Sequence, residues 1–171
     1  MKIVVLNGSP RINGNTAKLV EEFKIGAELA SHEVHVILAG ALNIKGCLGC
    51  DSCHNIGAKG CVVQDDMTRV YKDIEDADMI VLASPVYYFG LTGQLQNTIS
   101  RFYSVDKIKK VHKYALLLTS YSPNVYDAII SQYKQIVSYF NAEDMGIITA
   151  YGAERGSESK LKEVFEFAKN L

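Results

Sequence analysis

The stretch LNGSPRINGNT, residues 6–16, joins an apolar segment to a helix and decides the fold. KIVVLN, residues 2–7, has the continuous apolar character of a strand that is buried on both faces. Beyond residue 16, apolar side chains recur at helical spacing, at Val20, Phe23, Ala27 and Ala30. A simple connection would not need the glycines, the arginine and the side-chain amides and hydroxyls that lie between, so this stretch is a candidate for function.

The alternation of strand and helix continues along the chain. Further strands are predicted at 33–38, 77–85, 114–120 and 145–152. The helices between and after them have apolar faces at Met67, Val70 and Ile74, at Leu91, Leu95, Ile99 and Phe102, at Val125, Ile129, Tyr133 and Ile136, and at Leu161, Val164, Phe165 and Ala168. We expect Asp65 or Asp66 to cap one helix, and Ser122 and Pro123 to begin another. Together these patterns predict one α/β domain over residues 1–171, with a parallel sheet covered on both faces.

Composition excludes several classes of function. Lys and Arg total 18 and Asp and Glu 19, and no basic run is long enough to indicate a nucleic-acid or anionic-membrane partner. The apolar runs are far shorter than the roughly 20 residues that cross a bilayer, and no signal peptide is recognisable. We therefore expect a cytoplasmic protein whose four cysteines are ligands or redox thiols rather than disulfides.

The loop after the first strand has the residues of a phosphate site. Backbone N–H groups and the dipole at the start of a helix attract anions, and Gly8 and Gly14 allow close approach of the backbone. The side chains that can bind a phosphate are Ser9, Arg11, Asn15 and Thr16. Alternatively, Asn15 or Thr16 is an ordinary helix cap. Neither a Walker A loop nor the Gly-x-Gly-x-x-Gly pattern is present, which disfavours ATP and NAD as tightly held cofactors.

The loop after the third strand, ASPVYYFGLTGQL at 83–95, is aromatic and suits a flat ring. In an open parallel sheet the ligand lies beyond the carboxyl ends of the strands, so we expect the loops after strands one, three and four to form the site. The alternative is that Tyr87, Tyr88 and Phe89 pack into the core or a subunit interface.

Four cysteines are concentrated in the long segment 39–64. Cys47, Cys50, Cys53 and Cys61 have the spacing C-x2-C-x2-C-x7-C. Thiols at every third residue can converge on the irons of a [4Fe-4S] cluster. The same four thiols could bind zinc or could remain free, and the spacing leaves all three interpretations open.

These motifs resemble those of the NADPH-dependent FMN reductase branch of the flavodoxin-like superfamily. Members typically begin Gly-Ser-Pro-Arg-x-x-Gly-Asn-Thr and have Ser-Pro-Val-Tyr in the second loop, as Gly8–Thr16 and Ser84–Tyr87 do here. The cysteine segment 46–67 is similar to that of iron-sulfur flavoproteins. Where relatives have Lys and Asp in the third helix, this chain has Gln96 and Ser100, and its third loop, TSYSPN at 119–124, lacks the glycines of many relatives.

The resemblance implies a flavodoxin-like three-layer sandwich with strand order 2-1-3-4-5 and bound FMN. It places the phosphate at Ser9, Arg11, Asn15 and Thr16. It places the isoalloxazine against Pro85, Val86, Tyr87, Tyr88, Phe89 and Gly90, with Ser120 and Tyr121 in the third loop. It also implies a homodimer or homotetramer.

The function expected on this basis is an NAD(P)H-dependent oxidoreductase that reduces flavin, quinone or another small acceptor. No catalytic side chain is named, because the flavin carries the hydride transfer. The alternative is an iron-sulfur flavoprotein that carries electrons between protein partners. A response regulator would need an Asp where Ser84 and Pro85 lie, and a phosphatase of this layout would need a cysteine within 7–16.

Overall fold

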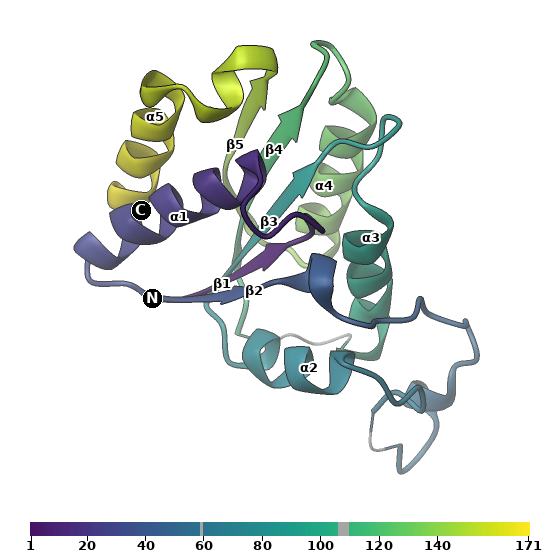
Figure 1. The fold of residues 1–171 in the computed structure, drawn as a ribbon. Helices are drawn as coiled ribbons and strands as arrows, with labels where there is room; N and C mark the ends of the chain where they lie inside the picture. Colours follow the sequence, from purple (N-terminus) through teal and green to yellow (C-terminus); the bar gives the residue numbers. More distant parts are fainter. Residues whose placement is uncertain (59, 106–109) are drawn as a thin grey trace.

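The sheet has five parallel strands in the order β2-β1-β3-β4-β5 (Figure 1). The computed structural model describes residues 1–58, 60–105 and 110–171. The strands are β1 (Lys2–Asn7), β2 (Glu33–Ile37), β3 (Met79–Pro85), β4 (Lys113–Ser120) and β5 (Glu143–Tyr151). At the centre of the sheet Val5 pairs with Val36 on one side and with Val81 on the other. The flavodoxin-like order and the five expected strands are confirmed.

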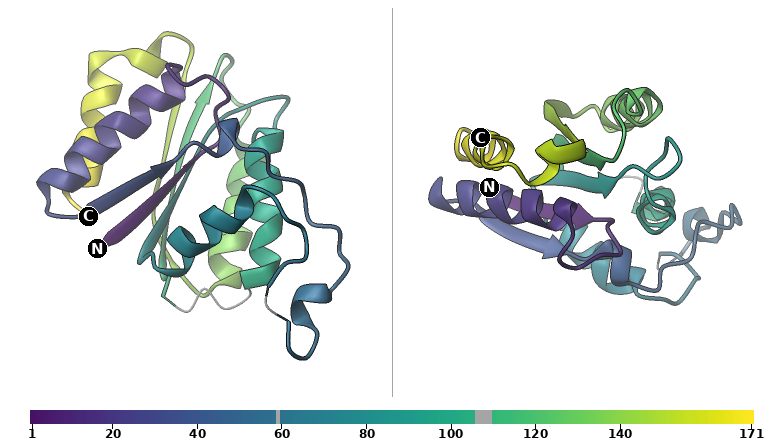
Figure 2. Two further views of the ribbon diagram at one scale, coloured as in Figure 1. Left: turned by 60° about the horizontal axis from the view of Figure 1, so that its bottom comes forward. Right: turned by 45° about the horizontal axis from the view of Figure 1, so that its top comes forward.

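Five α-helices cover the two faces of this sheet (Figures 1 and 2). They are α1 (Asn15–Leu29), α2 (Met67–Glu75), α3 (Gly93–Ser100), α4 (Asp127–Tyr139) and α5 (Glu158–Lys169). α1 and α5 pack on one face, and α2, α3 and α4 pack on the other. The central strands alternate between the faces, so Val5 contributes to the first core and Val4 to the second. Because both faces are buried, these strands are apolar throughout.

The start of α4 differs from the expectation. Ser122 and Pro123 lie in a connection, and the helix begins at Asp127. Asn124 has a φ of 58°, a left-handed conformation that a helix cannot include. The Ser120 hydroxyl donates to Ser122 O and bonds the Tyr126 hydroxyl at 2.6 Å, which holds the connection folded back on the end of β4.

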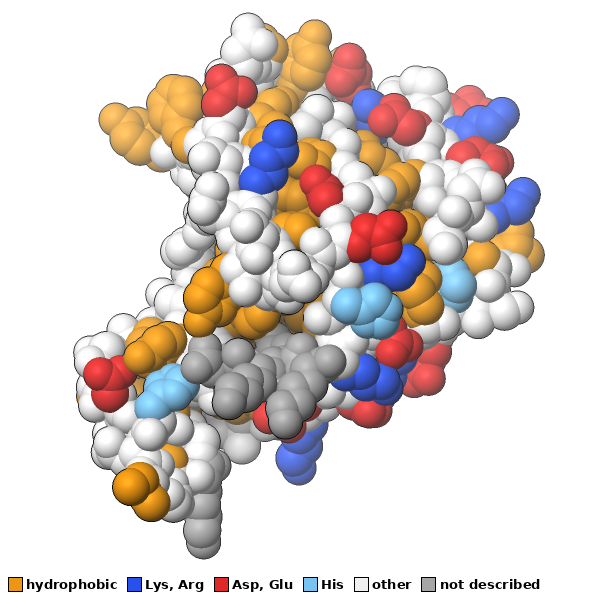
Figure 3. Space-filling view, turned by 180° about the vertical axis from the view of Figure 1, so that it is seen from behind, with side chains coloured by type: hydrophobic (Ala, Val, Ile, Leu, Met, Phe, Trp, Pro, Cys, Tyr) orange, Lys and Arg blue, Asp and Glu red, His pale blue; other side chains and the backbone are white. Residues whose placement is uncertain are grey.

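The segment between β2 and α2 is a long connection, and its described residues include the short 3-10 helices η1 (Ala39–Ala41) and η2 (Ser52–His54). Its second half, whose described residues 46–58 and 60–64 we call the cysteine loop, projects from the body of the protein (Figures 1 and 3). Two further 3-10 helices, η3 (Arg101–Val105) and η4 (Gly152–Gly156), follow α3 and β5. In the described part of the chain no helix is long and apolar enough to cross a membrane.

Candidate functional site

A cleft of about 730 Å³ opens at the carboxyl ends of β1, β3 and β4. It is lined by Ser9, Arg11, Asn13, Gly14, Asn15, Thr16, Pro85, Val86, Tyr87, Thr119, Ser120, Tyr121 and Arg155. The loops after strands one, three and four therefore meet here, as the sequence predicts. We call this cavity the strand-end cleft.

The first loop forms a compact turn that leads into α1. Ser9 N–H donates to Asn7 Oδ1 at 3.0 Å, the Ser9 hydroxyl accepts the Arg11 N–H at 3.2 Å, and Gly14 N–H donates to Arg11 O at 3.1 Å. The N-cap position of α1 is Gly14, and no side chain caps the helix there. The expectation that Asn15 or Thr16 caps the helix is wrong, because both lie inside its first turn.

This arrangement leaves the start of α1 directed at the cleft without a capping side chain. The first N–H groups of a helix have no partner within the helix and must be satisfied from outside. Thr16 cannot serve as the cap from within the helix, and its hydroxyl bonds the Thr119 hydroxyl at 2.8 Å across the cleft floor. An anion in the cleft would satisfy these N–H groups and would also interact favourably with the helix dipole.

The first loop is fixed against α3 by close packing. A Cβ at Gly8 would lie 2.6 Å from Leu95 Cβ, so only glycine fits there. The Thr92 hydroxyl donates to Gly8 O at 2.7 Å and accepts the Leu95 N–H at 3.3 Å, which caps α3. Thr92 therefore links the first loop to the start of α3.

The second loop contains a two-residue hairpin turn. Tyr87 and Gly90 exchange backbone hydrogen bonds of 3.0 and 3.1 Å, and Tyr88 and Phe89 at the tip have φ values of 49° and 64°. Positive φ is a strained conformation for bulky residues. Of the six residues expected to contact a ring, Pro85, Val86 and Tyr87 line the cleft. Tyr88, Phe89 and Gly90 do not, and Tyr88 is 98% exposed.

The remaining wall comes from the ends of β4 and β5. Ser120 and Tyr121 line the cleft as expected, although the Ser120 hydroxyl is already bonded within the β4–α4 connection. Sequence reasoning missed Asn13, Thr119 and Arg155. Asn13 and Thr119 adjoin residues that were named, whereas Arg155 lies in η4 after β5, where no motif drew attention to it.

The four cysteines line one small hollow at the other end of α3. Cys47 N–H donates to the hydroxyl of Ser100, the last residue of α3, while the first loop is bonded through Gly8 O to Thr92 at the start of the same helix. The eight residues of α3 span about 12 Å along the helix axis. Burial raises the pKa of the Cys53 thiol, and a hydrogen bond from Ser52 lowers that of Cys50.

The thiols have the chemistry of cluster or zinc ligands, but their placement does not make a ligand set. Among the described residues, which include all four cysteines, no group of three or more Cys, His, Asp or Glu side chains is positioned to hold a metal ion. We therefore assign no electron-transfer step to an iron-sulfur cluster.

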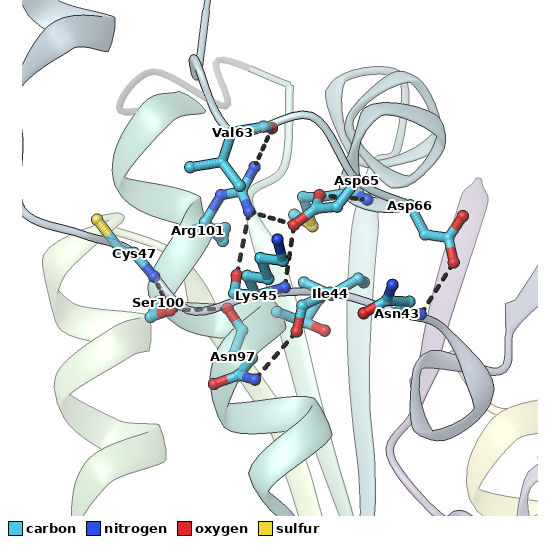
Figure 4. A network of polar contacts seen from close by, with 12 residues as sticks. Asn43, Ile44, Lys45, Cys47, Val63, Asp65, Asp66, Asn97, Ser100 and Arg101 are labelled. Atoms are coloured by element: carbon cyan, nitrogen blue, oxygen red, sulfur yellow. Dashed lines mark hydrogen bonds and ion pairs between the residues drawn. The ribbon is translucent and has the colours of Figure 1, made fainter.

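A buried arginine at the start of η3, directly after α3, fastens both ends of the cysteine loop (Figure 4). The Arg101 side chain is 1% exposed and donates to Asp65 Oδ2 at 2.8 Å. It also donates to Lys45 O at 3.0 Å, before the loop, and to Val63 O at 3.1 Å, near its end. Asp65 in turn accepts the Met67 N–H from one residue before the N-cap position, which is Asp66; the Asp66 side chain forms no capping bond, so the expected side-chain cap at the N-cap of α2 is not found. The pair therefore fixes the base of the cysteine loop.

The sheet order and the position of the cleft define a flavodoxin-like α/β protein. The model of the NADPH-dependent FMN reductase family matches residues 1–154, and the chain belongs to that family. An iron-sulfur flavoprotein of Archaeoglobus fulgidus is 38% identical over 102 residues, which are 59% of this chain and 45% of that protein. One from Methanocaldococcus jannaschii is 35% identical over 101 residues, 59% of this chain and 51% of that protein.

The chain thus spans about half the length of the curated relatives it matches. Among solved structures, the NAD(P)H:quinone oxidoreductase from Methanothermobacter marburgensis has the same fold, with a TM-score of 0.69 at 15% identity. That likeness covers 99% of this chain and 93% of the other.

Proposed function

We propose that the protein is an FMN-dependent NAD(P)H oxidoreductase that reduces a flavin, a quinone or another small acceptor. The observation that supports this most strongly is the uncapped start of α1 in the strand-end cleft. The family match supports FMN as the cofactor, and the cleft offers an anion site next to an aromatic loop. A cytoplasmic location and a homodimer or homotetramer belong to the same proposal.

Each wall of the cleft has a part in holding the cofactor. Ser9, Arg11, Asn15 and Thr16 surround the phosphate, and the N–H groups at the start of α1 complete its hydrogen bonds. Pro85, Val86 and Tyr87 lie against the ring, with Tyr88, Phe89 and Gly90 at the edge of the site. Ser120 and Tyr121 close the opposite side. Bound FMN supplies the hydride and electron chemistry, and the protein orients it and limits the access of water.

Tyr87 and Tyr121 are the tyrosines among the described lining residues, and their hydroxyls could donate a proton. Within the described lining there is no His, Asp, Glu, Lys or Cys. In the proposed function the cofactor carries the reaction, and the chain contributes position and electrostatics. The electron donor is therefore expected to reach the ring from the open side of the cleft.

An electron carrier between proteins is the second candidate function. It is favoured by the four cysteines that share one hollow near the far end of α3. The absence of a converged ligand set among the described residues makes it the weaker candidate.

The test is to purify the protein without oxygen, add FMN, and follow NADH and NADPH oxidation with a quinone and with free FMN as acceptors. Turnover that depends on bound FMN is the expected result. FMN-loaded protein that oxidises neither nucleotide but accepts electrons from a reduced protein would instead support the carrier. Iron and sulfide assays on the same sample decide whether the cysteines bind a cluster.

A further inference from the structure

The strand-end cleft has two positively charged side chains, and the sequence motif accounts for only one of them. Arg11 belongs to the loop after the inner strand β1, whereas Arg155 comes from η4, which follows the edge strand β5. No carboxylate is among the described lining residues. A phosphate monoester carries a charge of about −1.5 to −2 near neutral pH, so a single arginine leaves part of that charge uncompensated.

Arg155 is held in place by two contacts. Its Nε–H donates to Gly152 O at 2.7 Å, which ties the side chain back to the start of η4. Its guanidinium carbon lies 5.7 Å from the centre of the Tyr121 ring, a cation–π distance. Among the described residues no carboxylate pairs with this guanidinium, and its two terminal nitrogens remain available to a ligand. The Arg155 side chain is therefore fixed in position, while its positive charge is not neutralised by a described carboxylate.

η4, which carries Arg155, ends beside the start of α1. A Cβ at Gly156, the next residue, would lie 3.7 Å from Asn15 Oδ1 at the first residue of α1. η4 thus ends against the uncapped helix start described above. Gly152 begins η4 with a φ of 52°, which turns the chain sharply out of β5 toward α1.

We propose that Arg155, supported by Tyr121, is a second counter-charge for the phosphate of the bound mononucleotide, on the opposite side from Arg11. This assignment rests on the proposed function, because it presumes that FMN occupies the cleft. It goes beyond the motif in the first loop, since it places part of the phosphate site in the connection after β5. An arginine suits the role because its planar guanidinium can donate two parallel hydrogen bonds to phosphate oxygens.

The test compares FMN with riboflavin, which has the same ring and ribityl chain but no phosphate. Dissociation constants are measured by flavin fluorescence for the wild type and for Arg155→Ala, Arg155→Lys and Tyr121→Ala. Lys162→Ala is the matched control, because Lys162 is exposed on α5 and does not line the cleft. Thermal melts of all variants without flavin show whether each remains folded.

We expect Arg155→Ala to weaken FMN binding about 10- to 100-fold, the range of a charged hydrogen bond, and to leave riboflavin binding within about twofold. Arg155→Lys should recover part of the loss as a point charge. Tyr121→Ala should weaken FMN binding less than Arg155→Ala. Lys162→Ala should bind both flavins as the wild type does.

Three results would overturn the assignment. Equal weakening of FMN and riboflavin would mean that Arg155 only supports the fold of the cleft. Unchanged FMN binding would remove Arg155 from the phosphate site, and a raised KM for NADPH alone would then place it at the electron donor. If the wild type bound neither flavin, the proposed function itself would fail, a result distinct from the other two.

Discussion

Replacing Arg101 with Met should destabilise the protein strongly, although Arg101 is outside the strand-end cleft. Methionine has a similar length and no charge, so it fills most of the space while removing the guanidinium. Four hydrogen bonds are lost, to Asp65 Oδ2, Lys45 O, Val63 O and the Tyr71 hydroxyl. The Asp65 side chain, 3% exposed, would remain as a buried carboxylate without its cation.

The expected loss in the free energy of unfolding follows from that buried carboxylate. Removing one partner of a buried ion pair costs about 3–5 kcal/mol, because the other charge is left uncompensated. For a chain of this length, that loss corresponds to a fall in Tm of roughly 6–20 °C. Asp65 keeps the N–H groups of Lys45 and Met67, which places the expected loss toward the lower end of the range.

The assay is urea unfolding of the flavin-free protein, followed by circular dichroism. Arg69→Ala is the control, because Arg69 forms an exposed ion pair with Asp66 and its removal should cost about 1 kcal/mol or less. Combining Arg101→Met with Asp65→Asn should cost clearly less than the sum of the two single changes. A loss for Arg101→Met no larger than that of the control would refute the reasoning.

Three further predictions concern pH and the first loop. Burial opposes ionisation of Asp65, but hydrogen bonds from the backbone and from Arg101 hold its pKa below the usual value. The contribution of the Asp65 carboxylate to the free energy of unfolding is therefore complete above about pH 4 and is lost as pH falls through the lower folded pKa. Urea unfolding between pH 3 and 6 should show that the free energy of unfolding of Asp65→Asn depends less on pH than that of the wild type. An unchanged pH dependence would contradict this. Gly8→Ala should raise the FMN dissociation constant and lower the free energy of unfolding by about 1–3 kcal/mol, since the new Cβ would lie 2.6 Å from Leu95 Cβ. Wild-type affinity and stability in this variant would show that the loop adapts freely. Thr92→Val should lower the free energy of unfolding by about 1–2 kcal/mol, because the α3 cap and the hydrogen bond to Gly8 O are lost. No change in the same unfolding assay would show that Thr92 does not link the first loop to α3.

Features that depend on local pattern could be predicted from the sequence. The strands are apolar throughout because both faces of the sheet are covered, so their positions follow from composition alone. The first loop was recognisable because the glycines, Ser9 and Arg11 come together just before a helix. The start of α4 was not, because it depends on the left-handed Asn124 and on the bond between Ser120 and Tyr126.

Features made by contacts distant in the sequence were not predictable. Arg101 lies 36 residues from Asp65 and 56 from Lys45, and a lone arginine at the end of a helix has no pattern that reveals such partners. Arg155 reaches the cleft only because η4 folds against the start of α1. The aromatic loop gave the correct region, but the hairpin turn separates Tyr87, which lines the cleft, from Tyr88, which does not.

The central claim is that the strand-end cleft binds FMN with its phosphate at the start of α1. The most direct measurement is the visible absorption spectrum of the protein after incubation with FMN and removal of free flavin, recorded for the wild type and for Arg11→Ala. The account predicts a two-band flavin spectrum for the wild type and a smaller bound fraction for the variant, because the phosphate loses a counter-charge. A wild-type protein that emerges without flavin would contradict it.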